Sequence, residues 1–267
     1  MRHAYSGLFE KSAWAALITR EFRLAVVSRY FHIFSALALL GGIAAAIFSE
    51  DANATGFFHL QIALYFVSLF ALLAGVNSAQ AEREEWQLLF TQPISRPVFV
   101  VGKLFALATI FAGVLLLLFL PTVVAGAHFG ATSRLYFGTL LLAAAFLACG
   151  LAAGYFGQDR AQALIIGVSG WLLLLFGLDL IALFAAQWSG IQQWPDLWVA
   201  LLMLNPLDSF RIDALFALQQ IPAEAANKTA LAGWWTVHAG TWFAGIALFW
   251  SLAMMTQAGW RMNRWEE

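Results

Sequence analysis

The chain has 267 residues, of which 62% are hydrophobic and 11% are charged, and its mean hydropathy is +0.77. A soluble domain of this length does not bury so much apolar surface, so the composition excludes a soluble protein and indicates a lipid bilayer as solvent. The formal net charge is -1. Because the sequence has no basic stripe, it also argues against a nucleic-acid partner.

Apolar runs long enough to cross about 30 Å of hydrocarbon as helices recur along the chain. Helices satisfy their own backbone hydrogen bonds in lipid, and these runs are too long and unbroken for barrel strands. The sequence therefore predicts an all-α polytopic membrane protein. Its six predicted transmembrane helices lie near residues 30–48, 58–79, 104–127, 135–156, 163–186 and 234–257.

The distribution of basic residues predicts the orientation, because cytoplasmic loops of membrane proteins are enriched in Lys and Arg. If the N-terminus is inside, eleven of the fourteen basic residues are cytoplasmic and three are outside. The eleven are Arg2, Lys11, Arg20, Arg23, Arg29, Arg83, Arg96, Lys103, Arg160, Arg261 and Arg264. The three are Arg134, Arg211 and Lys228. Both termini are therefore predicted to be cytoplasmic.

The connection between the second and third predicted spans is long enough to fold. Residues 80–90 favour a short surface helix, with acidic residues in its first turn and an apolar end, and Pro93 ends it. The residues alone leave two interpretations open. The helix is either a plain connector or a rigid element that a soluble motor grips.

This connection resembles the cytoplasmic coupling segment of type-2 ABC exporter permeases. Three features carry the resemblance: an acidic helix, a Pro-x-x-Arg element from Pro93 to Arg96, and Gly102 with Lys103 opening the third span. Family members commonly have a small pair after the acidic cluster, where this chain has Trp86 and Gln87. The resemblance implies a set of ATPase-coupling residues, namely Glu82, Glu84, Glu85, Trp86, Pro93, Arg96 and Lys103.

Residues 19–29 resemble the amphipathic N-terminal helix that such permeases place along the inner leaflet. Apolar side chains recur at helical spacing, opposite the charged ones. These apolar residues are Trp14, Leu17, Ile18 and Phe22. A plain interfacial helix explains the pattern equally well.

The long segment before the last span contains a second predicted helix. Asn205 is suited to cap it, with Pro206 at the first helical position and Asp208 near the positive end of the helix dipole. The helix should run toward Gln220 and end before Pro222. One of its faces is apolar and consists of Phe210, Ala214, Leu218 and Ile221.

The stretch Leu204 to Arg211 resembles a Leu-Asn-Pro element in the permease of the nitrous oxide reductase and multicopper enzyme maturation family. We expect the helix to lie on the outer membrane surface. It then either docks an extracytoplasmic partner or closes the outer mouth of the bundle. The residues assigned to this outer helix are Asn205, Pro206, Asp208 and Arg211.

The resemblance implies one type-2 permease domain over residues 1–267. Its parts are a cytoplasmic amphipathic helix (1–29), spans one to five (30–186), an extracytoplasmic segment (187–233), span six (234–257) and a cytoplasmic tail (258–267). The implied function is that of the membrane subunit of an ABC exporter in the cell inner membrane. The implied assembly is a permease homodimer with two separate ATPase subunits, serving transport or extracytoplasmic enzyme maturation.

The chain itself is not predicted to be an enzyme. Gly102 and Lys103 lack the earlier glycine and the following Ser or Thr of a phosphate loop, so ATP hydrolysis is expected in a partner. An intramembrane enzyme would need paired carboxylates, a His-Glu-x-x-His motif or a Ser with a base, and the spans contain none. A non-transporting membrane scaffold for an assembly factor remains a second interpretation.

Three residues inside predicted spans invite a specific role. Asp179 is the only carboxylate well inside a span, where an ionised group costs several kcal/mol unless it is paired, hydrated or protonated. It is either a substrate-path or coupling residue, or a carboxylate that is bonded to a neighbouring helix or close enough to the outer interface to be hydrated. Gly150 and Gly154 follow the Gly-xxx-Gly pattern and predict close helix packing, within the subunit or across a dimer.

The residue types that bind transition metals are scattered. The five His residues lie in different segments, and Cys149 is the only cysteine. A copper path would need repeated Met, Cys or His on facing spans. The sequence therefore predicts neither a metal site nor a cofactor in this subunit.

Overall fold

The computed structural model describes residues 18–48, 52–81, 96–185, 187–188, 200, 202–218 and 230–263. Within these residues the secondary structure is helical, and six helices are long and apolar enough to cross a membrane. The predicted all-α fold with six spans is therefore confirmed. The spans are Arg29–Phe48, Asn53–Ala81, Phe99–Val124, Phe129–Phe156, Arg160–Ala185 and Val237–Met262.

Two of the spans contain a π-helical turn. The second span consists of α3 (Ala52–Ile62), the π-turn η1 (Ala63–Val67) and α4 (Ser68–Ala81). The fifth consists of α8 (Arg160–Leu172), the π-turn η2 (Leu173–Gly177) and α9 (Leu178–Ala185). The other spans are α2 (Arg29–Phe48), α6 (Arg96–Val124), α7 (Phe129–Phe156) and α14 (Ala230–Asn263). A helix over residues 18–27 precedes α2, and α12 (Pro206–Ala217) precedes α14.

Several spans begin earlier than the sequence predicts. The second begins at Asn53 instead of residue 58, and the fourth at Phe129 instead of residue 135. A search for apolar runs leaves out polar residues at the start of a helix, although their backbone forms the same helical hydrogen bonds. At the start of α7, for example, the Thr132 hydroxyl donates to the His128 carbonyl at 3.0 Å, so a polar side chain is satisfied by its own helix.

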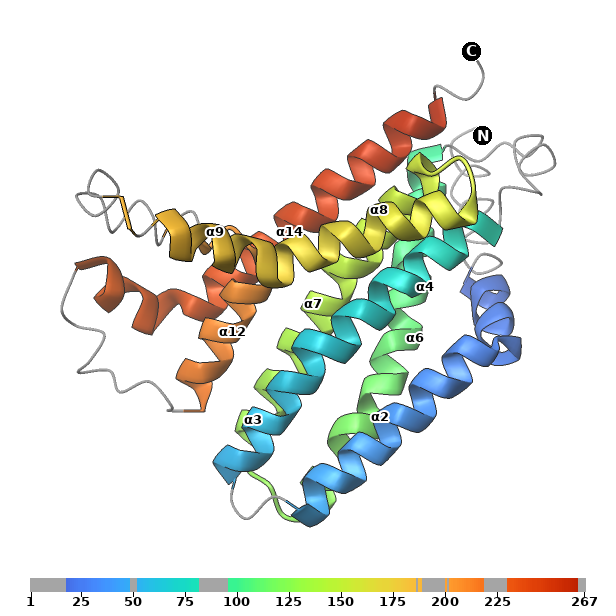
Figure 1. The fold of residues 1–267 in the computed structure, drawn as a ribbon. Helices are drawn as coiled ribbons and strands as arrows, with labels where there is room; N and C mark the ends of the chain where they lie inside the picture. The colour runs from blue at the N-terminus through green and yellow to red at the C-terminus, as the bar shows by residue number, and fades with distance from the viewer. Residues whose placement is uncertain are drawn as a thin grey trace, which may run out of the picture.

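The fourth span forms the centre of the bundle (Figure 1). In its most apolar window, 67% of the residues are buried, the largest share among the six spans. α4 packs along α7 most extensively, α14 and α6 also contact α7, and α2 packs against α6. A close backbone crossing between α4 and α7 is part of this core and is described below.

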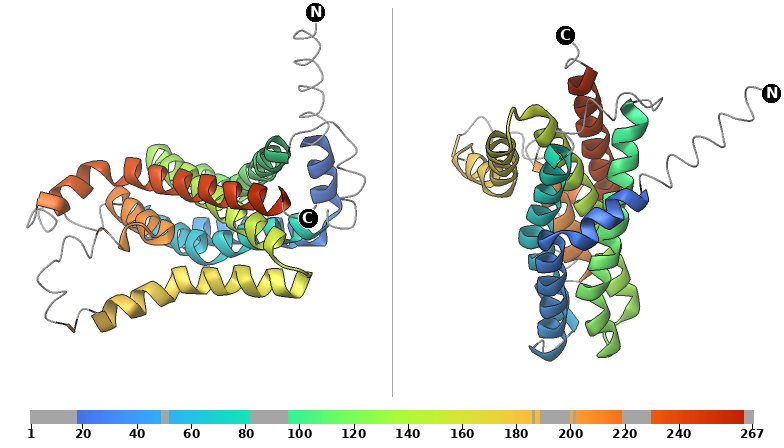
Figure 2. Two further views of the ribbon diagram at one scale, coloured as in Figure 1. Left: turned by 90° about the horizontal axis from the view of Figure 1, so that it is seen from above. Right: turned by 90° about the vertical axis from the view of Figure 1, so that its right-hand side faces the viewer.

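The fifth span lies at the edge of the bundle, as the two further views show (Figure 2). Only 17% of its most apolar window is buried. The indole nitrogen of Trp171 donates to the Ser68 hydroxyl at 2.9 Å, which ties α8 to the second span just after η1. Beyond η2, α9 exposes large apolar side chains, namely Leu180, Ile181, Leu183 and Phe184.

The bundle has two ends that differ in their polar contacts (Figure 1). At the N-terminal end lie the helix over residues 18–27, the end of α4, the start of α6 and the end of α14. At the opposite end lies α12, beside α9 and the first half of α14. The distribution of basic residues predicts that the N-terminal end is cytoplasmic.

Candidate functional site

The helix α12 begins as the sequence predicts. The Asn205 side-chain oxygen accepts a hydrogen bond from the Leu207 backbone N–H at 3.1 Å, and Pro206 occupies the first turn. Phe210, Ala214 and Leu218 form a buried face, as expected. The helix ends at Ala217, and Ile221 lies outside the described residues.

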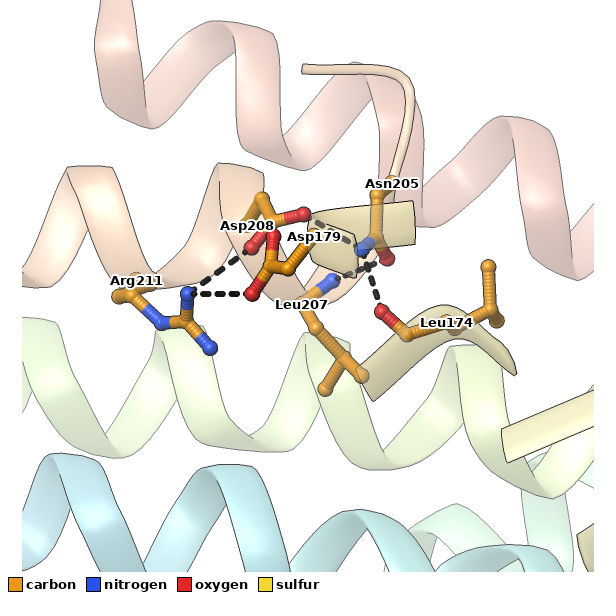
Figure 3. A network of polar contacts seen from close by, with 6 residues as sticks. All are labelled: Leu174, Asp179, Asn205, Leu207, Asp208 and Arg211. Carbon is orange, nitrogen blue, oxygen red and sulfur yellow. Dashed lines mark hydrogen bonds and ion pairs between the residues drawn. The ribbon is translucent and has the colours of Figure 1, made fainter. Parts of the chain in front are cut away.

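Asn205 also holds the fifth span. Its side-chain N–H donates to the Leu174 carbonyl at 2.7 Å and to the Asp208 carboxylate at 2.6 Å (Figure 3). Leu174 lies inside the π-turn η2, where the regular helical hydrogen-bond ladder is disturbed. A capping residue of one helix therefore also bonds a backbone carbonyl at the irregular turn of another. Hydropathy contains no signal for a π-turn, so the sequence did not reveal this contact.

Arg211 lies between two carboxylates (Figure 3). Its guanidinium is 3.1 Å from the Asp208 carboxylate, one turn earlier on α12, and 3.6 Å from the Asp179 carboxylate on α9. The Asp208 side chain is 9% exposed, whereas that of Asp179 is 48% exposed. We call Asp179, Asn205, Asp208 and Arg211 the Arg211 network.

The two carboxylates share one cation, and this affects Asp208. Burial, followed by the neighbouring charge of Asp179, raises the pKa of Asp208 to about 6, against the lowering effects of Arg211 and of the hydrogen bond from Asn205. Asp208 therefore changes its charge near neutral pH. A shifted carboxylate beside a half-exposed one is an arrangement found at functional sites and also in structural ion-pair networks.

The position of Asp179 agrees with the need for a partner. The sequence predicts that a carboxylate in this span must be paired, hydrated or protonated, and Arg211 of the outer helix is close enough to pair with it. The contact joins α9 to α12. A role of Asp179 in a substrate path or in coupling stays a prediction.

α12 and its preceding loop also contact the fourth and sixth spans. Asp213 pairs with Arg134 at the start of α7. Trp242 and Trp250 of α14 donate from their indole nitrogens to the carbonyls of Met203 and Leu204, at 2.9 and 3.0 Å. Spans four, five and six therefore all bind this one element. The sequence analysis missed these contacts, although the opposite charges of Arg134 and Asp213 were a signal for one of them.

An apolar cavity of about 380 Å³ lies next to this network, between α7, α8 and α14. Its walls include Leu174 and Trp250, which also contact the loop before α12. Nearly all of the lining is apolar, and Gln257 is its polar exception. Such a cavity suits a hydrocarbon group better than a charged one.

At the N-terminal end, most of the predicted coupling residues lie outside the described residues. These are Glu82, Glu84, Glu85, Trp86 and Pro93. The structure describes Arg96 as the first residue of α6, but not its side chain. The third span's helix thus begins at Arg96 and not at Gly102, so Lys103 lies inside it.

Lys103 is buried and has defined partners. Its ammonium is 3.5 Å from the Glu21 carboxylate and donates to the Ser78 carbonyl at 3.0 Å. Glu21 lies on the helix over residues 18–27, where Phe22 is exposed. Glu21 thus faces the protein and pairs with Lys103, a pairing that the sequence analysis did not identify.

Gly150 and Gly154 of α7 lie against α4. A Cβ atom built on Gly150 would lie 2.1 Å from the Leu72 carbonyl oxygen, and one on Gly154 would lie 2.5 Å from the Ala79 Cβ. Gly75 faces them from α4, with a built Cβ 2.5 Å from the Leu147 carbonyl. The close approach that the Gly-xxx-Gly spacing predicts thus occurs within this chain.

Among the residues that the structure describes, no group of three or more His, Cys, Asp or Glu side chains is arranged to hold a metal ion. His59 is buried in the second span, where its ring nitrogens contact the carbonyls of Thr55 and Leu118 and its ring stacks on Phe119. These contacts give His59 a packing environment.

The chain is similar to a protein that is named as an ABC transporter permease. It is 29% identical over 213 residues to a protein of Pseudomonas aeruginosa named probable ABC transporter permease protein NosY, over 74% of this chain and 76% of that protein. No family model matches the chain. The resemblance to ABC permeases of the NosY type, which the sequence motifs indicate, is confirmed by this match.

Proposed function

We propose that this chain, a multi-pass inner-membrane relative of ABC transporter permeases, is the membrane-spanning subunit of an ABC exporter-type complex. A separate ATPase subunit hydrolyses ATP and acts on the chain at its N-terminal end. The complex serves transport or the maturation of an extracytoplasmic enzyme. The observation that carries this proposal is the similarity to a permease over three quarters of both chains.

The arrangement of the helices supports a coupling role for residues 82–95, which we call the coupling segment. α4 ends at Ala81 and α6 begins at Arg96, so the segment joins two helices of the central bundle. α4 packs along the central helix α7. A force applied to the segment therefore reaches the core of the bundle directly.

The proposed assembly contains two permeases and two ATPases. Six spans are half of the usual translocation unit, as the resemblance implies. The first and fifth spans bury only 22% and 17% of their most apolar windows in this chain. Two poorly covered spans provide apolar surface for a second copy as well as for lipid.

The opposite end supports a role in enzyme maturation. α12 is held by spans four, five and six, so a protein that docks on α12 would act on three spans together. If the predicted orientation is correct, this end faces the extracytoplasmic side, where such an enzyme would mature. Docking of a partner on α12 is part of the proposal.

Co-expression with the cognate ATPase tests the proposal. The chain is purified in mild detergent through a tag, and native mass spectrometry measures the subunit ratio while a phosphate-release assay measures ATP hydrolysis. We expect two permeases with two ATPases and a hydrolysis rate that differs from that of the ATPase alone. A permease that binds no ATPase would overturn the proposal and favour a scaffold. A single permease per complex would refute the homodimer.

A further inference from the structure

A buried ion pair lies beside the coupling segment and joins three elements. Glu21 belongs to the helix over residues 18–27, Ser78 to the last turn of α4, and Lys103 to the second turn of α6. α4 and α6 are the two helices that flank the coupling segment. The helix over residues 18–27 precedes both of them in the chain and packs at the same end of the bundle (Figure 1).

The contacts within this group form a closed ring. The Lys103 ammonium is 3.5 Å from one Glu21 oxygen and donates to the Ser78 carbonyl at 3.0 Å. The Ser78 hydroxyl donates to the other Glu21 oxygen at 3.2 Å. Only 1% of the Lys103 side chain and 3% of the Glu21 side chain are exposed. Each element therefore has a polar contact with both of the others.

The outer side of the helix over residues 18–27 is different. Its exposed side chains include four large apolar ones, Phe22, Leu24, Val26 and Val27, together with those of Thr19 and Arg23. This surface suits the interface of a membrane. Lipid binding alone would let such a helix shift along the membrane surface, whereas a buried charge pair fixes its position relative to α4 and α6.

Stability alone does not explain a buried ion pair. Removing both charges from water costs free energy that the pair regains only with good geometry, so an apolar replacement often serves as well. A pair of this kind is better explained where the relative position of the elements matters. Here the elements it positions are the two attachment points of the coupling segment.

We infer that Glu21 and Lys103 are positioning residues for coupling, which hold the N-terminal helix to both ends of the coupling segment so that the three elements move as one body. This inference rests on the proposed function, because it assigns a purpose to the motion of the segment. It assigns Lys103 to contacts within this chain. Neither residue needs to contact the ATPase.

Hydrogen exchange of the full-length permease tests the positioning directly. Lys103→Met removes the charge and keeps the length of the side chain, so Glu21 loses its partner. Amides of residues 22–27 should then exchange at least about tenfold faster, because local opening no longer has to break the pair. Unchanged exchange in this helix would overturn the inference.

Two further variants make the comparison specific. Glu21→Gln should raise the exchange similarly, and the double variant should add little to either single change, as expected for two members of one interaction. Arg160→Met is the matched control, since Arg160 donates to the Asn77 side chain at 2.9 Å from an exposed position near the same end. Additive effects, or an equal effect of Arg160→Met, would contradict the inference.

A second measurement uses the complex with the ATPase and a non-hydrolysable ATP analogue. In the wild type, the analogue should change the exchange of residues 22–27 together with that of α4 and α6. In Lys103→Met the change should persist in α4 and α6 and disappear from residues 22–27. If it persists in all three elements, the pair does not couple them.

The two proposals fail in distinguishable ways. If no ATPase binds the wild-type chain, the proposed function fails, while the exchange of the permease alone still decides whether the pair positions the helix. If the ATPase binds and the nucleotide response of residues 22–27 is unaffected by Lys103→Met, the positioning role fails and the proposed function stands.

Discussion

Arg211 lies between two carboxylates that differ in their surroundings. Asp208 is nearly buried and Asp179 is half exposed, and each lies within 4 Å of the same guanidinium. Removing the cation would leave Asp208 buried beside a like charge, an arrangement that is strongly destabilising. The network therefore depends on Arg211 more than on either carboxylate.

The raised pKa of Asp208 predicts how stability depends on pH. The carboxyl ionises at about 6 in the folded chain and at 3.8 ordinarily. Between these values the folded state binds more protons at Asp208 than the unfolded state does. The contribution of Asp208 to stability is therefore greatest below about pH 4 and is lost as the pH rises through 6. Melting in detergent from pH 4 to 7.5 measures this loss, which should be on the order of 1–3 kcal/mol.

The matched variant for this prediction is Asp208→Asn, which keeps the shape of the side chain and an acceptor for Asn205. It should flatten the pH dependence between pH 4 and 6. Arg211→Met should lower the melting temperature more than Asp208→Asn does, and most strongly above pH 6, where Arg211 stabilises the ionised carboxylate of the wild type. A wild-type melting temperature that rises from pH 4 to 6, with a rise that Asp208→Asn abolishes, would contradict the raised pKa.

Asn205 combines a helix cap with a contact to another span, and two substitutions separate these roles. Asn205→Asp keeps an acceptor for the Leu207 N–H, but it loses the donor to Leu174 and places a second carboxylate beside Asp208. We expect it to destabilise the chain at pH 7.5 and to recover near pH 5, where the pair can hold a proton.

Asn205→Ala provides the comparison. It removes the cap and both donated hydrogen bonds without adding charge, so it should cost roughly 1–2 kcal/mol. The cost should be larger where Asp208 is ionised, because the bond from Asn205 favours the charged carboxylate. Thermal melting of both variants at the two pH values measures the difference. If Asn205→Asp shows no more pH dependence than Asn205→Ala, the short distance between Asn205 and Asp208 is not maintained in solution.

At the scale of elements, the close crossing of α4 and α7 depends on glycine residues, which have no side chain to hold the helices apart. The Cβ of Gly150→Ala would meet a backbone carbonyl of α4 at 2.1 Å, and a backbone atom cannot rotate away. The helices must then separate, which we expect to cost about 1–3 kcal/mol and to lower the melting temperature.

Gly245→Ala is the control for this substitution. A Cβ on Gly245 of α14 has no heavy atom within 4 Å. Alanine favours a helix over glycine by about 1 kcal/mol, so this change should be neutral or stabilising. Equal effects of the two substitutions would show that the crossing is looser than described.

The helices also show which parts of the fold can be predicted from the sequence. Long apolar runs predict six spans because a chain in lipid must form helices, and the Asn-Pro pair predicts the start of α12 from local capping alone. The π-turns and the pairing of Glu21 with Lys103 have no local signal. Residues 82 positions apart meet only through the packing of α4, α6 and the N-terminal helix.

Span boundaries were the other weak point. The third helix starts at Arg96 and not at Gly102, since Pro97 in the first turn needs no N–H partner and lets a helix begin there. Because the helix begins about two turns earlier than predicted, Lys103 lies within α6 and not at its start, and its side chain is buried. The family resemblance identified Lys103 as important for coupling without indicating that its partner is Glu21.

At the scale of the whole molecule, the ion pairs of the described residues lie at the two ends, and mainly apolar packing fills the middle. At one end, the Arg211 network joins span five to α12, and the Arg134–Asp213 pair and the indoles of α14 add spans four and six. At the other end, Glu21, Ser78 and Lys103 join the N-terminal helix to spans two and three. A motor that acts on the coupling segment would therefore move a body that is linked through α4 and α7 to the opposite end.

The claim that a separate ATPase drives this chain through the coupling segment is tested by neutralising two glutamates of the segment together with Arg96, which directly follows it. In the complex with its ATPase, Glu84→Gln/Glu85→Gln/Arg96→Gln is compared with Arg264→Gln/Glu266→Gln/Glu267→Gln, which makes the same charge changes in the C-terminal tail. ATP hydrolysis per complex is measured. The proposal predicts that the first variant loses the effect of the permease on ATP hydrolysis, while the tail variant keeps it. Equal binding and equal hydrolysis in both variants and the wild type would contradict it.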